Sequence, residues 1–250
     1  MTILLALDFE TTGLSLTEDL PVQVSLVLRE HTNGHYLDYP LVDQLCDPGK
    51  PIDPGATAVH GITDAMVSGM PSSWSVVEYA AQMAAYYAQG RESYLVGFNS
   101  NNFDVPMANN ILQRQAFTLP HIDVLRFARF YFPEVRGNMG GKTLGELHQV
   151  FLNRTLEGAH GAQADVIGTL DLLRAMQVRA QVTLAQLASE QSIARAYPVL
   201  PLGKHIGKPI SEVPYSWAKF LSAKTDLDPD LRATVDAIMN RPYVPSGAPA

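Results

Sequence analysis

Carboxylates stand at positions where this chain would otherwise bury apolar side chains, and the first pair is Asp8 and Glu10. They follow an apolar run, Ile3 to Leu7, that has the length of a buried strand. Because side chains alternate along a strand, Asp8 and Glu10 point the same way and Phe9 points into the core. Two carboxylates at the carboxyl end of a strand suit a divalent cation and phosphoryl-transfer chemistry. Alone, the Asp-x-Glu pattern is common, and an acidic strand end at the surface is the more frequent explanation.

A second carboxylate segment ends at Asp104. Residues 94–98 read as a short buried strand, and residues 99–102 as a loop whose asparagine side chains bond nearby backbone. Asp104 then opens a helix that we expect to run to about Ala116. Taken alone, helix capping or compensation of the helix dipole explains an acid at this position.

A third segment holds His160 and Asp165, five residues apart. Asp165 lies in the first turns of an expected helix with an apolar stripe that includes Val166 and Leu170. If residues 160–165 were all helical, this spacing would not place the two side chains on one face. Gly158 and Gly161 favour a loop instead, from which His160 can lean across the site beside Asp165. A lone histidine is more often structural than catalytic.

The three segments occur together and in order, and so resemble the motifs of the DEDD-type 3′→5′ exonucleases. The subclass is the one with His-x-x-x-x-Asp in its third motif, which includes DnaQ-like proofreading subunits and exonuclease X. The resemblance covers about residues 3–178. Its motifs are Asp8-x-Glu10-Thr11-Thr12-Gly13, Asn99-x-x-x-Phe103-Asp104 and His160-x-x-x-x-Asp165.

This resemblance implies an α/β fold of the ribonuclease H-like class, with a mixed β-sheet flanked by helices. It also implies that four carboxylates hold two Mg²⁺ or Mn²⁺ ions, and that His160 is the general base for the attacking water. The ligands would be Asp8, Glu10, Asp104 and Asp165. The chemistry is consistent, since hard cations choose carboxylate oxygens and the unperturbed histidine pKa of about 6.5 suits proton transfer near neutrality. The expected reaction is hydrolysis of the terminal phosphodiester of DNA, at single-stranded or frayed ends, releasing nucleoside 5′-monophosphates.

The same resemblance implies contacts to the terminal nucleotide. They come from Thr11, Thr12, Gly13 and Leu14, with Asn99 and Phe103 from the second motif. For the first four residues, simply turning the chain after the first strand is an equally good explanation. His60, in Val59-His60-Gly61-Ile62-Thr63, matches a segment that commonly precedes the second motif, and we expect it to be a hydrogen-bonded loop residue.

The chain departs from the family pattern at two positions. Gly97-Phe98 replaces the small residue and histidine that often precede the second-motif asparagine. Gly161 stands where a larger, often basic residue is common. Neither change removes a metal ligand, although the second makes the position of His160 less certain than that of the metals.

The chain divides into an exonuclease domain (1–180), a linker or helical connection (181–195), a small module (196–242) and a disordered tail (243–250). In the first part we expect strands near 2–8, 22–30, 35–42 and 94–98, a long loop over 43–71, a helix over 73–89 and a capping box that starts a helix at Thr143. The helix that follows residues 121–123 begins near Asp123, which is a candidate extra carboxylate of the site, although capping or a salt bridge explains it as well.

The small module resembles the one appended to exonuclease X, whose signature is Phe-Gly-Lys-x-x-Gly-Lys, with Leu202 in place of the phenylalanine. We expect a glycine-bent β-hairpin over 202–210 and helices near 214–222 and 228–239. About 45 residues are marginal for independent folding, so the module should pack on the main domain. Lys204, His205 and Lys208 are candidates for phosphate contacts, and Trp217 is expected in the core.

Composition agrees with a globular protein that acts on a chain end. The 250 residues are 46% hydrophobic, with one cysteine, which excludes an intramolecular disulfide and a cysteine-rich zinc site. No apolar run has membrane-spanning length, so we expect a cytoplasmic protein with no membrane contact. The net charge of −7 predicts modest, salt-sensitive affinity for long nucleic acid. A basic stretch between the second and third motifs comprises Arg126, Arg129, Arg136 and Lys142. These residues could bind phosphates, but a solvated helical face is the better explanation.

Two other functions stay open at this point. The same fold can act on RNA, because discrimination of the ribose depends on contacts near Thr12 and Leu14 that the sequence does not reveal. Alternatively, the chain is a proofreading or binding subunit that works with a polymerase or repair partner. The set of four carboxylates is complete, although burying charged groups costs free energy, and this argues against a pure binding module.

Overall fold

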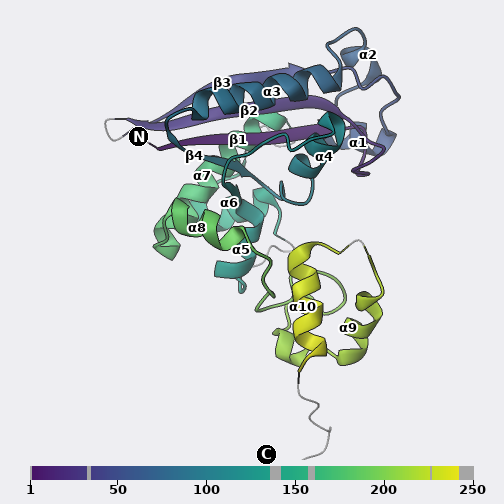
Figure 1. Cartoon of the computed structure of the whole chain (residues 1–250), viewed down its shortest axis with the longest axis vertical. Coiled ribbons are helices and arrows are strands. Elements are labelled where there is room, and N and C mark those ends of the chain that lie inside the picture. The colour runs from purple at the N-terminus through teal and green to yellow at the C-terminus, as the bar shows by residue number, and fades with distance from the viewer. Residues whose placement is uncertain (1, 33–34, 136–141, 157–160, 226, 242–250) are drawn as a thin grey trace, which may run out of the picture.

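The structure is a computed structural model that describes residues 2–32, 35–135, 142–156, 161–225 and 227–241. Its centre is one five-stranded sheet in the order β3-β2-β1-β4-β5 (Figure 1). The strands are β1 (Thr2–Thr11), β2 (Pro21–Thr32), β3 (His35–Leu45), β4 (Glu92–Gly97) and β5 (His121–Asp123). β1 pairs antiparallel with β2 and parallel with β4, and β4 pairs parallel with β5. The carboxyl ends of β1, β4 and β5 therefore meet at one edge of the sheet.

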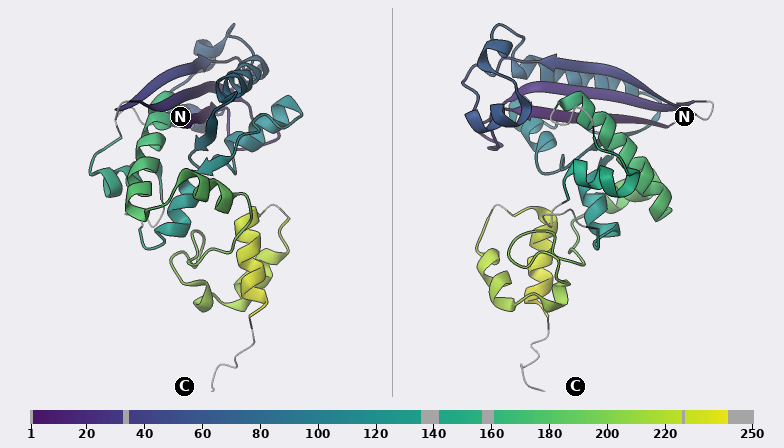
Figure 2. Two further views of the ribbon diagram at one scale, coloured as in Figure 1. Left: turned by 60° about the vertical axis from the view of Figure 1, so that its left-hand side comes forward. Right: turned by 180° about the vertical axis from the view of Figure 1, so that it is seen from behind.

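Helices cover both faces of this sheet (Figures 1 and 2). On one face, β1 contributes Ile3, Leu5 and Leu7 to a core shared with α3 (Ser73–Ala88) and α4 (Asp104–Leu112). On the other face, Leu4 and Ala6 belong to the core that four further helices form. These helices are α5 (Val124–Tyr131), α6 (Leu144–Leu152), α7 (Ala162–Ala180) and α8 (Leu184–Gln191). The expected mixed sheet flanked by helices is confirmed.

Several helix boundaries follow from local chemistry. Thr143 and Glu146 form the expected capping box of α6. α4 ends at Leu112, earlier than expected, because Gln113 takes a left-handed conformation with φ 53°. α8 occupies much of the connection that was expected to be a linker or a helix. Among the described helices, none is both long and apolar enough to cross a bilayer.

The segment 43–71 was expected to be a long loop, but it carries two short helices, α1 (Pro54–His60) and α2 (Asp64–Val67). Asp53 caps α1, and Pro54 stands at its first helical position, where the missing N–H costs nothing. A small core of Val22, Ile52, Ile62 and Val67 joins this segment to β2. This burial explains why the proline-rich sequence is folded.

The C-terminal module has a core of its own, formed mainly by α9 (Tyr215–Ser222) and α10 (Pro229–Met239) with a short 3₁₀-helix, η1 (Ile210–Glu212). Trp217 packs against this core, as expected. The hairpin expected over 202–210 is reduced to turns closed by one antiparallel bridge between Val199 and Pro209. Gly203 and Gly207 both have positive φ, so both lie in turns rather than in strands.

Arg29 joins three elements and leads to a prediction about stability. It lies on β2, is 5% exposed, and pairs with Asp38 on β3 and Asp171 on α7 at 2.6 and 2.8 Å. Replacing Arg29 by Met leaves Asp38 without its cation and Asp171 with the exposed Arg154 alone, and we expect urea unfolding to show a loss of about 2–4 kcal/mol. The control is Arg154→Met, since Arg154 pairs with the same Asp171 from an exposed position. That change should cost less than about 1 kcal/mol. Equal losses would contradict the prediction.

Candidate active site

Three carboxylates come together at the carboxyl edge of the sheet. One carboxylate oxygen each from Asp8, Glu10 and Asp165 can be chosen so that all lie within 4.8 Å of one another. The alternation of β1 directs Asp8 and Glu10 toward the face on which α7 packs, while Phe9 is buried in the opposite core. Asp165 lies in the first turn of α7. The strand and the helix together thus build an acidic site that could hold a metal ion.

Asp104 reaches the same region from α4, which packs on the other face of the sheet. It is 3% exposed, and its Oδ1 accepts a hydrogen bond of 2.9 Å from the backbone N–H of Phe9. The carboxylate is not part of the close group of three, but its charge acts on Asp8 more strongly than that of any other acid. The capping explanation for Asp104 is therefore incomplete, since its carboxylate accepts hydrogen bonds both from its own backbone N–H at the start of α4 and from β1.

The electrostatics of these acids are those of a site that needs a cation. Burial, followed by the charges of Asp104, Glu10 and Asp165, raises the pKa of Asp8 well above its usual range. Burial and the neighbouring acids raise the pKa of Glu10 to about 8. Burial raises the pKa of Asp104 to about 7. Within the described part of the chain, no lysine or arginine pairs with Asp8, Glu10 or Asp104. Oxygen ligands with uncompensated negative charge fit a hard divalent cation.

His160 lies outside the described residues, so its role stays a prediction. The described helix α7 starts at Ala162, with Gly161 as its N-terminal cap residue in an extended conformation. The Gly161 carbonyl accepts hydrogen bonds from the amides of Ala164 and Asp165. The alternative in which residues 160–165 are all helical is therefore wrong.

The turn after β1 is held by hydrogen bonds of its own. The Thr12 hydroxyl donates to Asp19 at 2.7 Å, and the Thr11 hydroxyl donates to the Gly13 carbonyl at 2.7 Å. A Cβ on Gly13 would lie 2.5 Å from the Asp19 carboxylate, so the turn requires glycine here. Turning the chain thus accounts for Thr11, Thr12 and Gly13, whether or not they also touch a substrate. Leu14 is different, because its side chain is 87% exposed.

Asp19 and His60 both support this turn. No pattern in the sequence pointed to Asp19, which becomes visible only once Ser15, Thr12 and Lys50 converge on its carboxylate. The Nδ1 atom of His60 accepts from the Ile62 N–H, so the proton is on Nε2, which donates to the Thr11 carbonyl at 3.1 Å. Burial lowers the pKa of His60. The expected hydrogen bonding of His60 is confirmed, but its expected place in a loop is wrong, because His60 is the last residue of α1.

The second-motif loop, residues 99–102, lies beside the acids at the end of β4. Asn99 is left-handed, with φ 60°, and its side-chain oxygen accepts from the Asn102 amide. Phe103 is partly buried against the core under α4. Asp123 caps α5 through the Arg126 N–H and also accepts from the amides of Asn99 and Asn101. The capping explanation for Asp123 is confirmed, and the bonds to the loop are an addition.

The basic stretch differs from the solvated helical face that we expected. Arg126 is buried and forms an ion pair of 2.5 Å with Asp230 of the C-terminal module. Arg129 lies over the Tyr197 ring at 5.9 Å from its centre. Lys142 donates to the Phe132 carbonyl at 2.6 Å. Arg136 lies outside the described residues. A polar face of α5 is covered because the module packs there, which the sequence of α5 does not reveal.

Comparison with known families decides the classification. A model of the RNase T exonuclease family matches residues 5–173, and this span contains all three motifs. The chain belongs to this exonuclease family. The resemblance noted in the sequence, to DEDD-type DnaQ-like exonucleases, is thereby confirmed.

Members with curated descriptions are longer than this exonuclease chain. A DNA polymerase III subunit epsilon-like protein of Rhodobacter capsulatus is 31% identical over 191 residues, or 73% of this chain and 25% of the relative. A PolC-type DNA polymerase III of Lacticaseibacillus paracasei is 31% identical over 198 residues, or 76% of this chain and 13% of the relative. The chain thus spans a quarter or less of these two relatives.

Solved exonucleases share the fold. Exonuclease I of E. coli in complex with a dT13 oligonucleotide has a TM-score of 0.59 at 19% identity, covering 78% of this chain and 47% of that one. Exonuclease X in complex with 5′-overhanging duplex DNA has a TM-score of 0.53 at 23% identity, covering 76% of this chain and 98% of that one. The sheet and its helices are therefore those of the exonuclease fold.

The acidic cluster predicts a pH dependence of stability. The pKa values of about 8 for Glu10 and about 7 for Asp104 lie above their ordinary values of 4.5 and 3.8. The folded chain therefore binds more protons than the unfolded chain between these limits, and its free energy of unfolding falls as pH rises. We expect the Tm in EDTA to be about 5 °C lower at pH 8 than at pH 6 through this cluster. Saturating Mg²⁺ should raise the Tm more at pH 8 than at pH 6.

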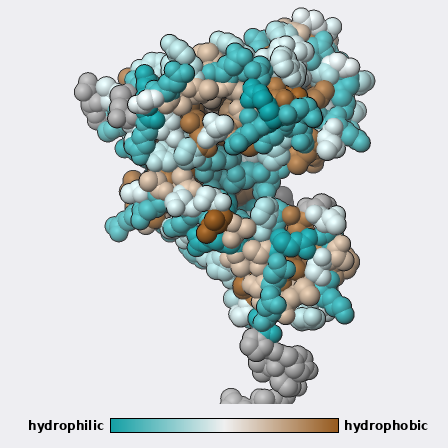
Figure 3. All heavy atoms as spheres, viewed as in Figure 1, coloured by the Kyte–Doolittle hydropathy of each residue, from teal (hydrophilic) through white to brown (hydrophobic). Residues whose placement is uncertain are grey.

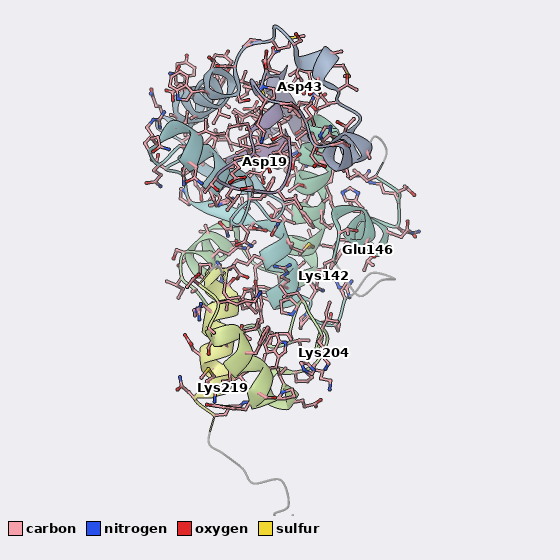
Figure 4. All side chains as sticks on the ribbon, turned by 90° about the vertical axis from the view of Figure 1, so that its right-hand side faces the viewer. Asp19, Asp43, Lys142, Glu146, Lys204 and Lys219 are labelled. Atoms are coloured by element: carbon pink, nitrogen blue, oxygen red, sulfur yellow. The ribbon has the colours of Figure 1, made fainter. Side chains whose placement is uncertain are left out.

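Two variants separate this effect from general acidity. Glu10→Gln should reduce the pH dependence in EDTA, since it removes one of the acids with a raised pKa. Asp43→Asn, at an exposed position of β3 (Figure 4), should leave it unchanged. Equal pH slopes in the wild type and Glu10→Gln would show that the cluster is not the origin.

Proposed function

We propose that this chain is a metal-dependent 3′→5′ exonuclease that releases nucleoside 5′-monophosphates from the 3′ end of DNA. The observation that carries the proposal is the convergence of Asp8, Glu10 and Asp165 within 4.8 Å, at the edge of the sheet, in a chain of the exonuclease family. Asp104, buried next to them, completes the set of four acids.

In this proposal each side chain has a defined task. Asp8, Glu10, Asp104 and Asp165 hold the cations, and Mg²⁺ or Mn²⁺ fits their oxygen donors. When bound, two such ions stabilise the attacking and the leaving oxygen of the displacement. His160 takes the proton from the attacking water. The exposed Leu14 follows β1 and the Asn99 loop follows β4, the two parallel strands whose carboxyl ends meet at the acids, which supports a contact with the terminal nucleotide. Thr11, Thr12, Gly13 and Phe103 are proposed to contact the same nucleotide.

DNA is the favoured substrate, and a free 3′ end in single-stranded or frayed form the favoured site of attack. The names of the relatives support DNA, since they are subunits or forms of DNA polymerase III. The structural relatives carried a dT13 oligonucleotide and an overhanging duplex. On the C-terminal module, Lys204, Lys208 and Lys219 are exposed and form no ion pair with a residue that the structure describes, which leaves them available for phosphates. Figure 4 labels Lys204 and Lys219. We place the protein in the cytoplasm, in DNA repair or metabolism.

One alternative partner has specific support. The epsilon-like relative points to a role beside a polymerase, in which the chain would proofread rather than act alone. A preference for RNA remains the second alternative within the same chemistry.

The test is a digestion of one single-stranded DNA oligonucleotide, labelled at its 5′ end in one tube and at its 3′ end in another. A ladder from the 5′ label and immediate release of a mononucleotide from the 3′ label are expected with Mg²⁺ and absent with EDTA. The matching RNA oligonucleotide, run in parallel, should be cleaved more slowly. Faster cleavage of RNA than of DNA would show that RNA is the preferred substrate. No cleavage of either would refute the proposal.

A further inference from the structure

The carboxylate of Asp123 gathers three backbone amides around itself. Its Oδ1 accepts from Asn99 and Arg126, and its Oδ2 accepts from Asn101, each at 3.1 Å. The residue is 1% exposed, so water does not replace a lost partner easily. Two of the three amides belong to the 99–102 loop, which connects the end of β4 to the helix that carries Asp104.

This loop needs an anchor because its conformation is not one that the backbone prefers. Asn99 has φ 60°, in the left-handed region, which is tolerated by asparagine but costs free energy. A Cβ on Gly97 would lie 2.3 Å from the Ser100 hydroxyl, so the chain folds back tightly on the end of β4. A loop of this kind relaxes when the group that gathers its amides is removed.

Asp123 is in turn held from the C-terminal side. Gln191, the last residue of α8, accepts from the Asp123 N–H at 2.8 Å and donates to the Asp123 carbonyl at 3.2 Å. Arg126, one turn further along α5, donates to the carbonyls of Gln191 and Ile193 at 2.5 and 2.6 Å. Hydrogen bonds therefore continue from the loop, through Asp123, into the chain that leads to the module.

The network ends on α10 of the C-terminal module. Two nitrogens of Arg126 meet the two oxygens of Asp230 at 2.5 and 2.8 Å, and the Arg195 N–H donates to the same carboxylate at 2.8 Å. Both side chains of the ion pair are buried. α5 lies between the sheet and α10 (Figures 1 and 2), while an indentation separates the two units on one side (Figure 3). The ion pair is thus a main point of contact between module and domain.

We propose that Asp123 and Arg126 are positioning residues of the nuclease site, and that the C-terminal module, through Asp230, holds the 99–102 loop in the conformation that binds the substrate. The inference rests on the proposed function, in which this loop contacts the terminal nucleotide. Asp104 is anchored separately, by the Phe9 N–H and by the buried Met107 and Ala108 of its own helix. Loosening the loop therefore weakens substrate binding and leaves the metal site in place.

The kinetic test uses the full chain with Asp123→Asn, Asp230→Asn and the double variant, on a 5′-labelled single-stranded DNA oligonucleotide. The matched control is Asp228→Asn: Asp228 also lies at the start of α10, but it caps the Leu231 N–H rather than meeting Arg126. We expect Asp123→Asn to raise KM about tenfold, with kcat within about threefold and Mn²⁺ affinity unchanged. Asp230→Asn should act in the same direction, the double variant should fall short of the product of the two effects, and the control should stay near wild type.

A second measurement does not depend on activity. Amide hydrogen exchange at Asn99 and Asn101 should be faster in Asp230→Asn than in Asp228→Asn, because only the former breaks the network. If Asp123→Asn does not fold, Arg126→Lys serves in its place, since lysine keeps the charge but loses the two-pronged contact with Asp230.

Unchanged exchange in Asp230→Asn, or a loss confined to kcat and Mn²⁺ affinity, would overturn the inference. A wild type that cleaves neither DNA nor RNA would refute the proposed function, and the exchange comparison would then still decide whether the module holds the loop.

Discussion

Asp165→Ala will remove 3′→5′ cleavage, by at least about a thousandfold in kcat, while the chain stays folded. The physical reason is that Asp165 supplies one of three carboxylates that converge within 4.8 Å, and a site for hard cations depends on the number of its oxygen ligands. Asp8→Asn should have the same effect, because Asp8 lies among all the other acids. Cleavage is measured with the 5′-labelled oligonucleotide under saturating Mg²⁺.

The control for this experiment is Asp171→Asn, on the same helix as Asp165. Asp171 pairs with Arg29 and Arg154 and has no part in the acidic site, so its variant should lose stability and keep turnover. In EDTA, Asp8→Asn should melt no lower than the wild type, because one of several mutually repelling charges is gone. Full activity of Asp165→Ala in a preparation free of host nuclease would contradict the assignment of Asp165 as a metal ligand.

His160→Ala is expected to lower kcat by about 10²–10⁴-fold, which is the range for loss of a general base. The chain order supports this, since His160 directly precedes Gly161, and the Gly161 carbonyl accepts from the Asp165 amide at 3.1 Å. The pH profile tests whether His160 is the base. The kcat of the wild type should decrease as the pH is lowered through about 6.5, and this decrease should be absent in the variant. Mn²⁺ affinity should be unchanged, because the four acids are intact.

His31→Ala is the matched control, since His31 packs against the tilted ring of Tyr36 at the opposite end of the sheet. Its kcat and pH profile should equal those of the wild type. An acid limb that persists in His160→Ala would assign the proton transfer to another group and reduce His160 to a minor role.

Strands, helices and the acid positions could be read from local patterns. The apolar run Ile3–Leu7 predicted a strand, along which Asp8 and Glu10 must face the same way, and the stripe around Leu170 predicted α7. Both predictions depend only on the regular repeat of side-chain directions along a strand or a helix. The segment 43–71 was harder, since its two helices are too short to show periodicity and are stabilised by a core shared with Val22 of β2. The hairpin over 202–210 failed because the glycines there make turns rather than strand ends.

At the active site, the types of residue in the three motifs and the order of the motifs were enough to identify four acids and the family. The acids are Asp8, Glu10, Asp104 and Asp165. Carboxylates in apolar surroundings are rare, and three such segments in sequence carry that information without a structure. Which groups hold the site in shape was decided by tertiary contacts alone. Asp19 under the first turn, Asp123 under the second-motif loop and the Arg126–Asp230 pair join positions far apart in the chain. A hydrogen bond between residues far apart in the chain produces no recognisable sequence pattern, so these contacts can be identified only in the folded structure.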